Sequence, residues 1–160
     1  MEFLSVRALL RIMTGDASLR IGHEPSGKPV LPSWFVSISH TRGYAALMLS
    51  EEEQVALDIE QRSERVRRIA SRFIRPDEQA ATTEDMLAIW SAKETLYKLY
   101  SEDELLFSDM RISFLESGLM GENLKRAEHV QVFHELTDDY VLTWATRSGS
   151  TQQPRTIQTI

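Results

Sequence analysis

Three short apolar runs follow one another between residues 34 and 60, and the connections between them are only three or four residues long. The runs are 34–40, 44–49 and 54–60, and each is rich in the aliphatic, aromatic and hydroxyl-bearing side chains typical of strands. A connection this short joins antiparallel neighbours, because parallel strands need a long crossover between them. The sequence therefore predicts an antiparallel meander of three strands.

Helical patterns lie on both sides of these strands. Residues 2–13 carry an apolar stripe at helical spacing that includes Leu4. A second helix is predicted over 66–73, where apolar residues recur at i, i+3, i+4 and i+7, and a longer one over 86–100. The segment 23–33 is dense in Pro, Gly and Ser, so we expect a loop there.

The C-terminal part of the chain returns to strands. The runs 110–115, 129–136 and 140–146 have strand character, and the last two are predicted to form a hairpin. Together these elements indicate the α+β class, with antiparallel strands packed against a few helices. We expect a single domain over residues 1–146, followed by a polar, disordered tail over 147–160.

Composition excludes several classes of function. The 160 residues include no cysteine, which rules out disulfides, iron–sulfur clusters and thiolate nucleophiles. A formal net charge of -6, from 18 Lys and Arg against 24 Asp and Glu, argues against nucleic-acid binding. No apolar run approaches the length of a membrane span, and charged residues interrupt the N-terminal stripe, unlike a secretory signal. We expect a cytoplasmic protein that binds neither nucleic acid nor membrane, and its oligomeric state stays open.

Asp58 and Glu60 are the first candidates for chemistry. They are two residues apart on a predicted strand, so their side chains point to the same face. Adjacent carboxylates repel each other unless both meet water or a cation lies between them. Two interpretations stay open here: a solvated strand end, or a hard-cation site, since Mg²⁺ binds one or two protein carboxylates together with water and substrate phosphate.

Trp90, Glu94 and Lys98 share one helical face, at i, i+4 and i+8. Glu94 and Lys98 alone would be an ordinary surface pair worth ~0.2–0.5 kcal/mol. The large aromatic on the same stripe indicates that this face is at least partly buried. A partly buried carboxylate beside an ammonium group is a better candidate for catalysis than a solvated one.

Other polar segments are weaker signals. Ser39 and His40 end a predicted strand and bring a hydroxyl and an imidazole close to backbone N–H groups, a combination that binds anions. Lys28 lies in a Gly-Lys-Pro sequence for which a plain turn is the simpler interpretation. A set of arginines is either a solvated cationic face or a docking strip for an acidic partner. Its members on one helical stripe are Arg65, Arg68, Arg72 and Arg75.

Taken in order, these segments resemble the 4′-phosphopantetheinyl transferase superfamily, and its larger, pseudo-twofold type more than its small trimeric type. The matching segments are 27–29, 35–41, 55–60, 69–73 with Glu78, and 90–94 with Lys98. The resemblance covers about residues 2 to 100 well and the C-terminal strands loosely. It implies the α+β fold of that superfamily with an incomplete first pseudo-half, because members of the larger type have a further segment before the first helix.

The resemblance also implies a reaction. Such an enzyme transfers the 4′-phosphopantetheine arm of coenzyme A to a serine of an apo-acyl or peptidyl carrier protein and releases 3′,5′-ADP, acting as a holo-carrier-protein synthase. The carrier could belong to fatty-acid, siderophore, peptide or polyketide synthesis. Phosphoryl transfer of this kind depends on positioning and charge neutralisation.

The superfamily's functional positions fall on named residues of this chain. The resemblance implies that Asp58, Glu60 and Glu94 hold Mg²⁺, and that Glu94 is also the general base for the serine hydroxyl. Lys98 matches the position that contacts and neutralises the pyrophosphate. The positions that hold the nucleotide end of coenzyme A match Lys28, Ser39 and His40. Lys93 and Glu78 match supporting positions.

Two departures from the family pattern stand out. Ala56 takes the place of a usual glycine, and the residue that usually grips the 3′-phosphate falls at about Met1, so that Arg7 and Arg11 are the nearest substitutes. Two alternatives therefore remain beside the transferase: a non-catalytic module of the same fold that binds carrier protein or nucleotide, and another Mg²⁺-dependent enzyme that transfers or hydrolyses phosphate.

Overall fold

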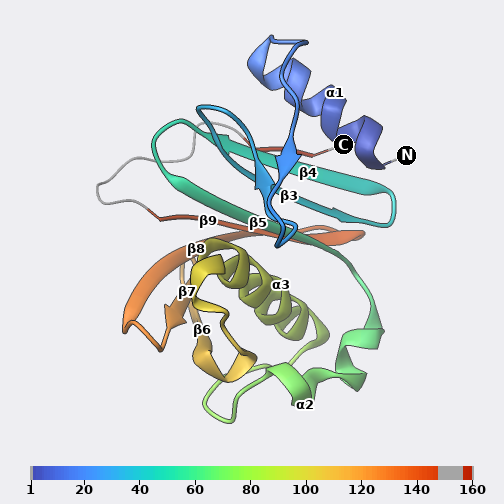
Figure 1. Cartoon of the computed structure of the whole chain (residues 1–160). Helices are drawn as coiled ribbons and strands as arrows, with labels where there is room; N and C mark the ends of the chain where they lie inside the picture. Colours follow the sequence, from blue (N-terminus) through green and yellow to red (C-terminus); the bar gives the residue numbers. More distant parts are fainter. Residues whose placement is uncertain (1, 148–156, 160) are drawn as a thin grey trace.

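Two antiparallel sheets make up the body of the computed structural model, which describes residues 2–147 and 157–159. The smaller sheet has the strand order β10-β4-β3 and the larger one the order β5-β9-β8-β7-β6. In Figure 1, helix α1 covers the outer side of the smaller sheet and helix α3 packs against the larger one. The predicted α+β class is confirmed. No helix within the described residues is both long enough and apolar enough to cross a membrane.

The elements follow one another in a simple order. They are α1 (Glu2–Thr14), β1 (Gly22–His23), β2 (Pro29–Val30), β3 (Phe35–Thr41), β4 (Tyr44–Ser50), β5 (Gln54–Gln61), the 3₁₀ turn η1 (Glu64–Arg68), α2 (Ala70–Phe73), α3 (Thr83–Leu99), the 3₁₀ turns η2 (Ser101–Asp103) and η3 (Phe107–Asp109), β6 (Met110–Leu115), β7 (Gly118–Asn123), β8 (Glu128–Leu136), β9 (Tyr140–Arg147) and β10 (Ile157–Thr159).

The smaller sheet carries α1 on one side. Leu9 and Leu10 of α1 are buried and join Val36 and Leu47 of the sheet in one core cluster. Leu4 is 68% exposed, so the prediction that it belongs to this stripe is wrong. It lies on the opposite side of the helix from Leu9 and Leu10, as the 3.6-residue repeat requires.

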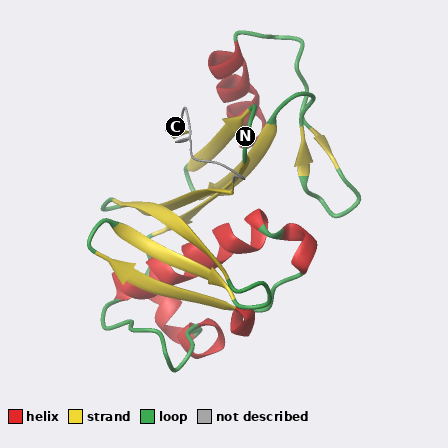
Figure 2. Ribbon diagram, turned by 90° about the vertical axis from the view of Figure 1, so that its left-hand side faces the viewer, coloured by secondary structure: helices red, strands yellow, loops and turns green. Residues whose placement is uncertain are grey.

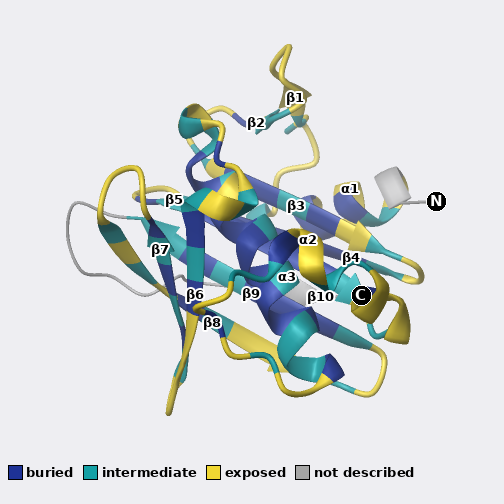
Figure 3. Cartoon of the chain, turned by 90° about the horizontal axis from the view of Figure 1, so that it is seen from below, coloured by how far each residue is buried: buried dark blue, intermediate teal, exposed yellow. Residues whose placement is uncertain are grey.

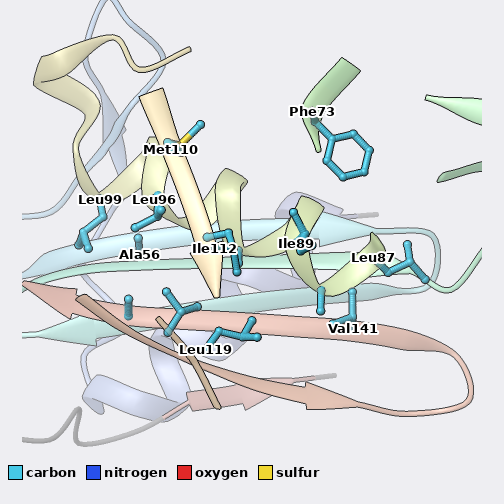
Figure 4. Close-up of a cluster of buried hydrophobic side chains, with 14 of the residues drawn as sticks. Ala56, Phe73, Leu87, Ile89, Leu96, Leu99, Met110, Ile112, Leu119 and Val141 are labelled. Atoms are coloured by element: carbon cyan, nitrogen blue, oxygen red, sulfur yellow. The ribbon is translucent and has the colours of Figure 1, made fainter. Parts of the chain in front are cut away.

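Helix α3 supplies much of the core beneath the larger sheet. Figure 4 shows its apolar side chains between strands β6, β7 and β9, and Figure 3 shows buried residues concentrated around this helix. The helix begins three residues before its predicted start at residue 86. Thr82 caps it, because its hydroxyl accepts the Asp85 N–H at 3.1 Å while the Asp85 carboxylate accepts the Thr82 N–H at 2.9 Å.

The predicted three-stranded meander is wrong in its third strand. β3 and β4 pair as expected, but β5 pairs with β9 along its whole length and belongs to the larger sheet. β5 nevertheless lies beside β3, because hydroxyls on alternate residues of β3 accept backbone N–H groups of β5. These bonds run to Ser37 from Leu57 (3.0 Å), to Ser39 from Ile59 (3.3 Å) and to Thr41 from Gln61 (3.0 Å). We call Ser37, Ser39 and Thr41 the hydroxyl seam.

The segment predicted as one helix over 66–73 is also different. It is split into η1 and α2, since Ile69 between them has φ −114° and ψ 0°, outside the helical range. Val66 and Phe73 are buried as the apolar pattern predicts. The predicted helical stripe of arginines is therefore not continuous: Arg65 and Arg68 lie on η1, Arg72 lies on α2, and Arg75 follows α2.

Three further segments depart from the predictions. The predicted loop 23–33 overlaps the short β1–β2 hairpin, which begins at Gly22 and stands beside the smaller sheet in Figure 2. Strand β7, which pairs with β6 and β8, was not predicted, because Gly118 and Gly121 weaken its strand pattern. Within the predicted disordered tail 147–160, Arg147 ends β9 and Ile157–Thr159 pair with β4, while 148–156 and 160 lie outside the described residues.

Candidate functional site

Asp58 lies where β5, β3 and α3 meet, and its side chain is held on both oxygens. Its residue exposure is only 3%. Oδ1 accepts from the Ser39 hydroxyl at 2.9 Å and from the Lys98 ammonium group at 2.8 Å. Oδ2 accepts from the Ser91 hydroxyl at 3.0 Å. The charge is therefore stabilised by three donors from two different elements, and the carboxylate has a fixed orientation.

Glu60 and Glu94 lie close enough to Asp58 for its negative charge to shift their pKa values. Burial raises the pKa of both carboxyls above the ordinary value of 4.5, and the negative charge of Asp58 raises each pKa further. The indole N–H of Trp90 donates to Glu60 at 2.9 Å and opposes this shift, as does the nearby Lys98. We call Asp58, Glu60 and Glu94 the acid cluster, a concentration of negative charge at the face of α3.

One face of α3 supplies the other half of this arrangement. Trp90, Glu94 and Lys98 are all half-buried, as expected for residues spaced at i, i+4 and i+8. The Lys98 ammonium group donates to the Leu57 carbonyl at 3.0 Å as well as to Asp58. The structure thus brings Lys98 together with the acid cluster, from an element 40 residues further along the chain.

The chemistry of the acid cluster suits a hard divalent cation, because its donors are carboxylate oxygens. Mutual repulsion also raises the pKa of Glu60 and Glu94, and a cation would relieve that repulsion. In the described part of the chain, however, no three Asp, Glu or His side chains are already spaced to hold a metal ion. The cation that contacts Asp58 is the ammonium group of Lys98.

A second candidate region lies on the other side of β3. A cavity of about 730 Å³ is enclosed by α1, the segment after it, the β1–β2 hairpin and β3. Three arginines and two histidines line it, and Asp16 is the one acidic residue among its lining side chains in the described chain. The arginines are Arg7, Arg11 and Arg20, and the histidines are His23 and His40. We call this region the arginine cavity; its charge suits an anionic ligand.

The three residues predicted to hold the nucleotide end are separated. His40 lines the arginine cavity, whereas Ser39, its neighbour on β3, faces Asp58. This follows from strand geometry, since successive side chains point to opposite faces. Lys28 lies between two residues that line the cavity, and its ammonium group donates to the Ser101 hydroxyl at 3.0 Å.

Lys93 and Glu78 form a separate ion pair. Both side chains are fully buried, with 2.8 Å between Lys93 Nζ and Glu78 Oε2, and Lys93 also donates to the Phe73 carbonyl at 2.6 Å. The second carboxylate oxygen of Glu78 accepts the Ile112 N–H at 2.7 Å. The pair ties α3 to the segment around α2 and to β6. This packing indicates a structural role.

Sequence reasoning missed the residues behind Asp58. Ser91 and Thr143 contact each other there, and Thr143 lies directly opposite Asp58 in the β5–β9 register. Ser91 stands inside the Trp90–Glu94 segment and could have been noticed as a small polar residue on the buried side. Nothing local marks Thr143, because its place follows from its pairing with Asp58, which lies on a strand distant in the sequence.

A family model described as the 4′-phosphopantetheinyl transferase superfamily matches residues 54–145. The match begins at the first residue of β5 and ends within β9, so it includes the whole acid cluster and Lys98. The chain therefore belongs to the 4′-phosphopantetheinyl transferase superfamily, as its sequence motifs predict. Membership defines it as a transferase of phosphopantetheine. A search among curated protein sequences gave no significant match.

Proposed function

We propose that this protein transfers the phosphopantetheine arm of coenzyme A to a serine of an apo-acyl or peptidyl carrier protein in the cytoplasm. The serine oxygen attacks the β-phosphorus, the bond to the leaving phosphate oxygen breaks, and 3′,5′-ADP departs. The observation that carries this proposal is the position of Lys98 on Asp58, with Glu60 and Glu94 beside them. Cationic and anionic groups are gathered where a pyrophosphate would react.

The roles of the individual side chains follow from their surroundings. Glu94 has a raised pKa and is half-buried, which suits a general base that accepts the serine proton. Lys98 would exchange Asp58 for a phosphate oxygen and neutralise the charge that develops on it. Mg²⁺, which Asp58, Glu60 and Glu94 would hold, supplies further neutralisation of the pyrophosphate when bound.

The arginine cavity is the proposed site for the nucleotide end of coenzyme A. Its size and cationic lining suit a phosphorylated nucleoside, and Arg7, Arg11 and Arg20 are the side chains that would meet the phosphates. His40 would contribute from β3, and Lys28 from the β1–β2 hairpin. Ser39 is not assigned to the nucleotide in this proposal, because its hydroxyl already donates to Asp58 and accepts the Ile59 N–H.

The test is incubation with coenzyme A, Mg²⁺ and an apo-carrier protein, followed by intact-mass measurement of the carrier. We expect a gain of one phosphopantetheine arm. Asp58→Asn and Glu94→Gln should each abolish the gain while the protein stays folded. Glu135→Gln, which removes an exposed carboxylate on β8, is the matched control. Full activity of either site variant would refute the proposed roles of the acid cluster.

A non-catalytic binding module is the alternative, and one observation favours it. Lys98 already neutralises Asp58, so the acid cluster could be a purely structural arrangement. Such a module would bind coenzyme A in the arginine cavity without any mass gain on the carrier. Calorimetric titration with coenzyme A, run beside the transfer assay, separates the two functions.

A further inference from the structure

A row of buried hydroxyls stands behind Asp58, on the side away from Lys98. Ser91 Oγ lies 3.0 Å from Asp58 Oδ2 and 2.9 Å from Thr143 Oγ1, and Thr143 Oγ1 lies 2.7 Å from Thr95 Oγ1. Ser91, Thr95 and Thr143 are all fully buried. We call these three side chains the hydroxyl relay. It connects two residues of α3 with one of β9, and it ends on the carboxylate.

The relay is anchored at the carboxylate by one donor. Ser91 Oγ donates to Asp58 Oδ2, and it also lies 3.4 Å from the Asp58 carbonyl oxygen. In the two contacts between hydroxyls, Ser91 to Thr143 and Thr143 to Thr95, either oxygen can be the donor, and Thr95 also reaches the Thr143 carbonyl at 3.4 Å. The Ser91 hydroxyl is therefore held between the carboxylate on one side and Thr143 on the other.

We propose that Ser91, Thr143 and Thr95 are positioning residues that hold the Asp58 carboxylate in one orientation, with its Oδ1 edge toward Lys98 and toward the divalent cation that the acid cluster would hold. The proposal rests on the proposed function, since it assigns these residues to the same site. Ser39 completes the arrangement from the opposite side by donating to Oδ1. The relay explains why three hydroxyls occupy fully buried positions where apolar side chains would otherwise pack.

Thr143 offers a pair of substitutions that separate positioning from packing. Thr143→Val keeps the shape of the side chain and removes the hydroxyl, whereas Thr143→Ser keeps the hydroxyl and removes a methyl group. Loss of an outer hydrogen-bond partner typically costs about 10- to 100-fold in metal affinity. Thr143 reaches Asp58 through Ser91, so we expect Thr143→Val to lower affinity for Mn²⁺, used alone as a paramagnetic probe, by about 10-fold, the lower end of that range. Thr143→Ser should stay close to the wild-type protein.

The affinity is measured by electron paramagnetic resonance of free Mn²⁺, with urea unfolding as a check of the fold. Ser37→Ala is the matched control, because Ser37 is a buried seam hydroxyl that accepts the Leu57 N–H without contacting Asp58. The losses should also be ordered by distance along the relay, largest for Ser91→Ala, intermediate for Thr143→Val and smallest for Thr95→Val. A merely structural role would give no such order.

Several outcomes would overturn the inference. Equal Mn²⁺ affinity in Thr143→Val and the wild-type protein would do so, as would equal losses in Thr143→Val and Thr143→Ser. If Thr143→Val fails to fold, Ser91→Ala and Thr95→Val carry the same comparison, and losses not ordered by position contradict the relay. A wild-type protein that transfers no phosphopantetheine and binds no Mn²⁺ refutes the proposed function, and the inference with it.

Discussion

The two lysines of α3 that lie five residues apart have opposite surroundings. Lys93 is fully buried and contacts Glu78 and the Phe73 carbonyl, inside the half of the protein built on the larger sheet. The Lys98 side chain is 29% exposed and contacts Asp58 where the two sheets meet. Both pairs have the same 2.8 Å separation between nitrogen and oxygen. Distance therefore does not distinguish them; access to solvent does.

That difference separates a structural pair from one that can react. Around Glu78 both oxygens are engaged, because Oε2 accepts from Lys93 and the Arg75 N–H, and Oε1 accepts from the Ile112 N–H. Neither member can change partner without leaving a buried charge alone. Lys98 can turn from Asp58 to a ligand, since part of its side chain already meets solvent. An exchangeable ion pair beside raised carboxyl pKa values is typical of a functional site.

The largest expected effect concerns the fully buried ion pair of Lys93 and Glu78. Lys93→Met leaves the Glu78 carboxylate buried without its cation, so we expect the free energy of unfolding to fall by about 3–5 kcal/mol. Urea unfolding followed by circular dichroism measures it. Lys98→Met should lose less, because Asp58 keeps the hydroxyl donors of Ser39 and Ser91 after the cation is removed. Similar losses in the two variants would break the comparison.

The second prediction concerns the partly exposed ion pair of Lys98 and Asp58. Lys98→Met removes a cation from the reacting phosphates, so kcat for transfer should fall by about 10²–10³-fold. The KM for the carrier should change much less, because Lys98 acts on the transferred group. Initial rates at varied carrier concentration separate the two constants. A raised KM with an unchanged kcat would instead assign Lys98 to carrier docking.

A third prediction extends the comparison to exposed charges without internal partners. Arg65, Arg68 and Arg72 are exposed on η1 and α2, and no ion pair to another described residue is found for them, whereas Arg67 pairs with Glu64. If they dock an acidic carrier, reversing Arg65 and Arg68 to Glu should raise the carrier's KM by roughly 3- to 10-fold. The KM for coenzyme A is the internal control. An unchanged carrier KM would leave them as a solvated face.

The smallest expected effect is a dependence of stability on pH. Burial and the charge of Asp58 raise the pKa of Glu94 in the folded protein above its ordinary 4.5. Between these two pKa values the folded state binds more protons than the unfolded state, so this group lowers stability as pH rises through that window. We expect Glu94→Gln to remove this decline. Urea unfolding of both proteins at pH 5 and pH 7, without divalent ions, gives the difference; parallel curves would contradict a raised pKa.

The sequence predicted much of the fold because most elements carry local signals. The alternating runs of β3 and β4 and the repeat of α1 needed no distant information. β5 was assigned to the wrong sheet because its partner, β9, lies some 80 residues away, and its own residues suit either pairing. Ser39 of β3 was interpreted as a ligand-binding group, and the structure shows its hydroxyl donating to Asp58 and accepting the Ile59 N–H of β5.

The candidate site was predictable to a similar degree, for a similar reason. Helical spacing placed Trp90, Glu94 and Lys98 on one face, and the structure has them so. Spacing could not show that Lys93 turns into the core, because that depends on where Glu78 is carried by the loop before α3. The resemblance to the superfamily supplied roles, which local pattern alone did not define.

The hydroxyl seam has a mechanical consequence. Two of its three bonds, to Leu57 and Ile59, are buried, and leaving a buried amide without an acceptor costs about 1–3 kcal/mol each. Sliding β3 away from β5 would therefore consume a large part of a typical domain's ~5–15 kcal/mol of stability. The sheets must travel together as one rigid block, and Asp58 travels with them. Helix α1 is itself held to the smaller sheet by Leu9 and Leu10, so any widening of the cavity for a bulky coenzyme is left to the β1–β2 hairpin.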